Sequence, residues 1–100
     1  MKYELKKMLE HDFLGIVTLS NQQIGNFELE RFAVSAVSLL NVYVNSKVIS
    51  QSDKLECAKF LCTQFNMGCN NQLSESIIVD LSNAIVEDLS IDFTVLKGII

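Results

Sequence analysis

The chain has 100 residues, of which 49% are hydrophobic and 20% are charged, and its formal net charge is −4. This length fits one compact domain over residues 1–100, and the apolar content is too high for an intrinsically disordered segment. No run approaches the roughly 18 uncharged apolar residues of a membrane-spanning helix, and the negative charge argues against direct binding of nucleic acid, which depends on Lys and Arg.

The N-terminal segment predicts a helix over residues 3–17. Apolar residues recur there at helical spacing, and Lys6, Lys7 and Glu10 fall on the opposite side. Residues 13–19 fit a strand as well, so the choice between helix and strand stays open for them, although helix is preferred. The polar residues 20–26 that follow are typical of a loop.

Residues 27–45 carry the strongest helix signal in the chain. Asn26 is a suitable N-cap, and Glu28 and Glu30 complement the helix dipole in the first turn. No charged residue occurs between Phe32 and Ser46. Because a helix without charge on either face is usually buried on both, we expect this helix to run through the middle of the domain. The alternative is that its second face forms a homodimer interface.

Two further helices are predicted to begin at Ser52 and at Ser74, which both suit the N-cap position, and Gly68 is placed to end the first of them. Residues 90–100 fit a last short helix. The alternation of residues 91–96 fits a strand equally well, but a lone strand among helices would lack a pairing partner. We therefore predict an all-α fold, a single compact domain of four to five helices around a central apolar helix at about residues 27–45.

The sequence offers little support for catalysis or for a cofactor. His11 is the only histidine and lies between Glu10 and Asp12. Adjacent residues on a helix point about 100° apart, so neither carboxylate is placed to orient the imidazole as a triad carboxylate would. The chain has no glycine-rich phosphate loop, since its glycines are isolated. We expect no enzymatic activity and no cofactor.

The three cysteines, Cys57, Cys62 and Cys69, do not have the C-x2-C spacing of zinc sites. Cys57 and Cys62 lie about 140° apart around a helix, so they cannot chelate a metal from one face. An odd number of cysteines and the lack of a secretion signal favour reduced thiols in the cytoplasm. We expect no metal site.

Charge is distributed unevenly along the chain. From Phe60 to Leu96 there are five acidic residues and no basic one. A local excess of one sign speeds encounter with a partner of opposite charge, although the acids would also serve solubility alone. In the predicted helix after Ser74, projection at about 100° per residue groups four side chains on the outer face. These are Ser76, Asp80, Asn83 and Glu87.

These features favour a small acidic protein-binding inhibitor, an immunity protein or antitoxin that neutralises a basic, nuclease-type bacterial toxin by occluding it. Seven of the eight basic residues are lysine, a bias that suits an AT-rich, horizontally acquired gene. The expected partner is a cognate toxin domain, with no direct contact to nucleic acid or membrane. The alternative function is a helical regulator or adaptor that acts as a homodimer. The predicted partner-binding residues are Glu75, Asp80, Asn83, Glu87, Asp88 and Asp92.

Overall fold

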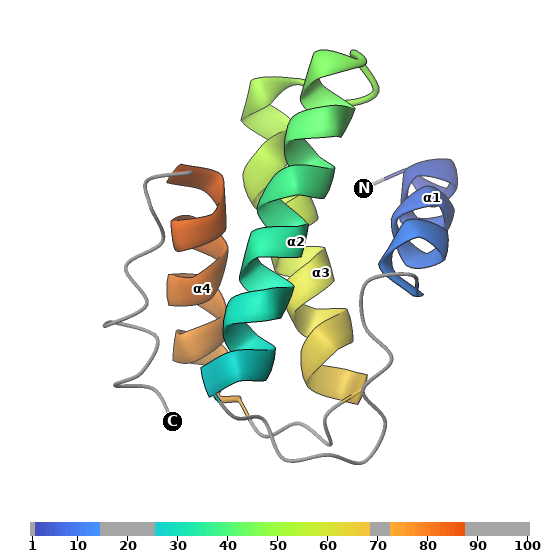
Figure 1. Cartoon of the computed structure of the whole chain (residues 1–100). Coiled ribbons are helices and arrows are strands. Elements are labelled where there is room, and N and C mark those ends of the chain that lie inside the picture. The colour runs from blue at the N-terminus through green and yellow to red at the C-terminus, as the bar shows by residue number, and fades with distance from the viewer. Residues whose placement is uncertain (1, 15–25, 69–72, 88–100) are drawn as a thin grey trace.

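The computed structural model describes residues 2–14, 26–68 and 73–87, and these ranges contain helices and turns but no strand (Figure 1). The elements are α1 (Tyr3–Leu14), α2 (Asn26–Asn45), a short 3-10 helix η1 (Gln51–Asp53), α3 (Lys54–Gly68) and α4 (Glu75–Glu87). The predicted all-α fold is confirmed. Residues 15–19 and 91–96, for which a strand was the alternative, lie outside the described residues.

The other three α-helices pack around α3, which contacts α1, α2 and α4. In Figure 1, α4 and α1 lie on opposite sides of the α2–α3 pair. Phe32 of α2 and Phe65 of α3 stack at the centre of the core, with 4.3 Å between ring centroids and 14° between ring planes. Leu81 and Ile85 complete this core from α4, and Leu9 from α1.

The predicted helix at about residues 27–45 is present as α2, but the expectation that both of its faces are buried is wrong. Val34 and Val42 are 50% and 58% exposed, and Ser38 between them is exposed as well. The other helices pack only against the stripe that contains Phe32 and Leu40. Four helices of this length form too small a bundle to surround one member completely, so the uncharged outer face of α2 stays at the surface.

The start of α3 lies two residues after the predicted N-cap Ser52, because the chain makes the 3-10 turn η1 before α3 begins at Lys54. Ser50 is the N-cap of η1. The backbone N–H of Ser50 and its hydroxyl both donate to Asp53 Oδ2, at 3.2 and 2.8 Å. These two hydrogen bonds hold the pKa of Asp53 below its ordinary value. The structure describes α3 as far as Gly68, the predicted end, and residues 69–72 lie outside the described residues.

A buried side chain fixes the approach from α3 to α4. The Asn66 Oδ1 atom accepts the backbone N–H of Leu73 at 2.8 Å, and the Asn66 amide donates to the Leu73 carbonyl at 3.2 Å. The backbone N–H of Ile77 then donates to the Ser74 hydroxyl at 3.4 Å, so Ser74 is the N-cap that the sequence predicts. Together these contacts set where α4 begins.

Candidate functional site

The outward face of α4 gathers the polar residues that the sequence projected together. Its inner face buries Leu81, Ser82 and Ile85 against the rest of the bundle. The 3.6-residue period therefore turns the opposite face to solvent. The four side chains expected on that face are all exposed, namely Ser76, Asp80, Asn83 and Glu87. We call this set the α4 face.

Of the six predicted partner-binding residues, the structure describes four. Asp80, Asn83 and Glu87 lie on the α4 face, whereas Glu75 is exposed in the first turn of α4, where its carboxylate complements the helix dipole. The other two predicted residues, Asp88 and Asp92, lie outside the described residues.

Val79 is an apolar neighbour of the α4 face that was not among the predicted residues. Its side chain is 39% exposed. It lies one helical turn before Asn83 and next to Asp80 in the sequence. Its angular position next to Asp80, at the edge of the apolar stripe, was the signal that its side chain would reach the surface.

The acidic charge of this side of the molecule has no basic residue beside it in the helix. Glu75, Asp80 and Glu87 are the charged residues of α4. The last basic residue before α4 along the chain is Lys59, which belongs to α3. The α4 face therefore presents negative charge without an alternating positive partner along its own helix.

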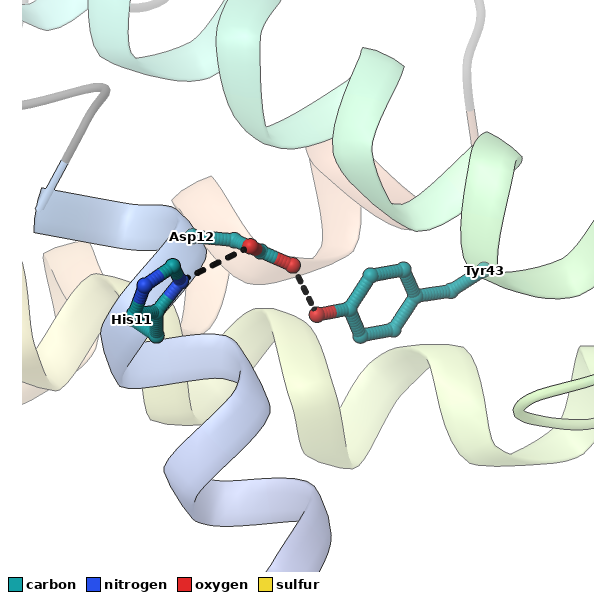
Figure 2. Close-up of polar contacts among 3 residues, drawn as sticks. All are labelled: His11, Asp12 and Tyr43. Carbon is teal, nitrogen blue, oxygen red and sulfur yellow. Dashed lines mark hydrogen bonds and ion pairs between the residues drawn. The ribbon is translucent and has the colours of Figure 1, made fainter.

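A second polar cluster joins α1 to α2, as Figure 2 shows. The Tyr43 hydroxyl of α2 donates a short hydrogen bond to Asp12 Oδ2 of α1. The other oxygen, Asp12 Oδ1, lies 3.4 Å from His11 Nδ1. The pKa of Tyr43 is raised above its ordinary value, first by burial and then by the hydrogen bond to Asp12 and by its charge.

The sequence argument that Asp12 would not orient His11 needs a correction, because the two side chains are in contact. The contact is long and solvated, however, since the His11 side chain is 89% exposed and that of Asp12 is 41% exposed. Asp12 also accepts a hydrogen bond from Tyr43, which lies 31 residues away along the chain and is buried. A tyrosine within an apolar stripe needs a partner for its hydroxyl when it is buried, and this was the available signal for the contact.

The two cysteines that the structure describes are free thiols and are buried. Burial raises the pKa of the Cys57 thiol to about 11 and that of the Cys62 thiol to about 12. Cys69 lies outside the described residues. Within residues 2–14, 26–68 and 73–87, no three His, Cys, Asp or Glu side chains are grouped so that they could hold a metal ion.

A search of the described residues finds no helix with the length and apolar character needed to cross a membrane. Comparison of the chain with protein-family models, with curated proteins and with solved structures finds no significant match. The geometry of the α4 face and the polar cluster between α1 and α2 are thus the basis for any functional argument.

Proposed function

We propose that this chain is a protein-binding inhibitor that docks its acidic α4 face on a basic protein, as an immunity protein or antitoxin docks on a nuclease-type bacterial toxin. The observation that carries the proposal is the α4 face itself. Asp80 and Glu87 are exposed one above the other on an outward helix face, with Asn83 between them. A bacterial cytoplasm, where thiols stay reduced, is part of the same proposal.

The physical basis is charge complementarity. A nuclease binds the phosphate backbone with Lys and Arg side chains, and carboxylates at comparable spacing take the place of the phosphates. Exposed charges of this kind set the rate of encounter more than the final affinity. We assign the close contacts at the centre of the interface to Val79 and Asn83, because central contacts that exclude water supply most of the binding energy. No cofactor is required.

The first experiment identifies the partner with matched variants. The immobilised protein is used to capture proteins from an extract of the source cell, in parallel with Asp80→Lys/Glu87→Lys and with Glu4→Lys/Glu10→Lys. Both variants reverse two exposed acids, but the second pair lies on α1. We expect the wild type and the α1 variant to capture the same basic protein and the α4 variant to lose it.

The second experiment tests inhibition with that captured protein. The proposal expects its nuclease activity to fall in proportion to added wild-type protein, with one copy per toxin domain. Equal capture by all three proteins, or a captured partner whose surface is acidic, contradicts docking through the α4 face. A captured nuclease that stays active when saturated contradicts inhibition.

A second candidate function is a helical regulator or adaptor that acts as a homodimer. The observation in its favour is the exposed, uncharged outer face of α2, with Val34 and Val42 at its two ends. Sedimentation equilibrium at micromolar protein concentration distinguishes the two functions, because a homodimer through this face is lost in Val34→Lys/Val42→Lys. A strict monomer in the wild type excludes the second candidate.

A further inference from the structure

Over residues 2–12, where the structure describes its side chains, α1 is sparsely attached to the rest of the molecule. Among residues 2–12, only Leu9 is fully buried, while Leu5 and Asp12 are half-buried. Tyr3 and Met8 keep 69% and 43% of their surface exposed. By comparison, α2, α3 and α4 share the stacked Phe32–Phe65 pair and most of the buried apolar side chains. The buried area that residues 2–12 contribute is therefore a small part of the core.

The polar attachment of α1 is concentrated at one point. The Tyr43 hydroxyl donates to Asp12 Oδ2, and this is a charge-assisted hydrogen bond between two helices. The other charged residues of α1 that lie on exposed positions, such as Lys6 and Glu10, project into solvent. Within residues 2–12, one hydrogen bond and one fully buried leucine thus carry most of the contact between α1 and its neighbours.

We propose that α1 is a latched helix, which opens from the body formed by α2, η1, α3 and α4 without unfolding that body, and that the Asp12–Tyr43 hydrogen bond is the latch. Regions with few buried apolar contacts open at a lower free energy than the whole molecule. The inference does not rest on the proposed function, because the latch and the α4 face share no residue.

Cys57 of α3 is a natural reporter of this opening. Its thiol is buried, and it lies near enough to the Tyr43 hydroxyl for its charge to raise the pKa of Tyr43. Opening of α1 uncovers the Tyr43 hydroxyl, and we expect it to uncover Cys57 as well. Cys62 is buried beside Ser82, on the side of α3 that faces α4, so it becomes accessible only when the body unfolds.

The test measures alkylation of each cysteine by iodoacetamide in the native protein. The thiolate displaces iodide, which leaves as the anion, and a stable thioether forms. Trypsin cleavage after Lys54 and Lys59 releases Cys57 in a peptide of its own, Leu55–Lys59. Cys62 shares the peptide Phe60–Lys97 with Cys69, and fragment ions in the mass spectrum assign the alkylation of each of these two cysteines. In the wild type we expect Cys57 to react at least about tenfold faster than Cys62.

Two sets of variants separate opening of α1 from unfolding of the body. Tyr43→Phe and Asp12→Ala remove the latch from either side, and each raises the Cys57 rate about 10- to 100-fold, as expected for loss of a charge-assisted hydrogen bond. Glu10→Ala, an exposed change on α1, leaves the rate unchanged. Asn66→Ala destabilises the body equally whether α1 is closed or open, so it does not change the opening equilibrium of α1 and leaves the Cys57 rate unchanged. It does favour unfolding of the body, so it raises the Cys62 rate.

Two results overturn the proposal. If Cys57 and Cys62 react at equal rates in the wild type and both accelerate in Asn66→Ala, the molecule opens as one cooperative unit and α1 is no separate element. If Cys57 reacts faster than Cys62 but is indifferent to Tyr43→Phe and to Asp12→Ala, α1 opens but the Asp12–Tyr43 hydrogen bond is not its latch.

Discussion

Several polar side chains inside this small domain are hydrogen-bonded across helix boundaries, and these bonds determine how the helices meet. Lys54 at the start of α3 is buried, and its ammonium donates to Asn41 Oδ1 of α2 at 2.8 Å. The Tyr43 hydroxyl of α2 likewise donates to Asp12 Oδ2 of α1. Among the described residues, no buried side-chain nitrogen or oxygen lacks a hydrogen bond. Such pairings are required because a buried polar group without a partner is costly.

At this scale the sharpest stability prediction concerns Asn66. Asn66→Ala removes both hydrogen bonds to the Leu73 backbone and leaves a buried N–H and carbonyl without partners. We expect the free energy of unfolding to fall by about 2 kcal/mol or more. Urea denaturation followed by circular dichroism measures this loss. Asn83→Ala, an exposed asparagine on α4, is the matched control and stays within about 0.5 kcal/mol of the wild type. Equal effects of the two changes contradict the role of Asn66.

At the scale of the elements, helix positions follow from sequence, whereas long-range contacts do not. The cap at Ser74 is a local signal, and it marks an observed helix boundary. The outward grouping of the α4 face also follows from the helical period alone. The Asp12–Tyr43 hydrogen bond could not be predicted, because it depends on how α1 lies against α2 and no periodicity within one helix specifies that.

The misjudged outer face of α2 has the same origin. Absence of charge from residues 32–46 predicts burial, but serine, asparagine and isolated valine side chains are also tolerated at a surface. Whether such a face is covered depends on how many other helices reach it. In this bundle α3 and α4 share the opposite side of α2, so the uncharged face stays exposed.

The exposure of this face of α2 predicts tolerance to charge. Val42→Lys places an ammonium on a side that is already open to solvent, so we expect the free energy of unfolding to change by no more than about 0.5 kcal/mol. Ala36→Lys, on the buried face of the same helix, is expected to prevent folding at room temperature. Denaturant titration of the two variants gives the comparison. Strong destabilisation by Val42→Lys would mean that this face is covered.

At the scale of the whole molecule, three buried groups that are protonated in the folded protein make its free energy of unfolding fall at alkaline pH. The pKa of Tyr43 is raised above its ordinary value of 10.0, and those of Cys57 and Cys62 are raised from 9.0 to about 11 and about 12. The unfolded chain therefore loses these protons at lower pH than the folded protein. The resulting stabilisation is complete below about pH 9 and is lost progressively as the pH rises through the folded-state pKa values.

The measurement is the urea midpoint at about pH 8 and about pH 10.5, which we expect to be clearly lower at the higher pH. In the variant Cys57→Ala/Cys62→Ala we expect the urea midpoint to fall less between the two pH values, because only Tyr43 of the three groups remains. A midpoint that is equal at the two pH values, or a variant with the same slope as the wild type, contradicts the assignment of alkaline sensitivity to these thiols.

The proposed function depends on the α4 face as the surface that binds a basic partner. The direct measurement is the association rate constant with the captured partner over a range of salt concentrations, for the wild type and for Asp80→Lys/Glu87→Lys. We predict that the variant associates at least about tenfold more slowly at low salt, and that its rate depends less on salt than that of the wild type. Circular dichroism must show that the variant is folded. An unchanged association rate and an unchanged salt dependence in the folded variant would contradict docking through the α4 face.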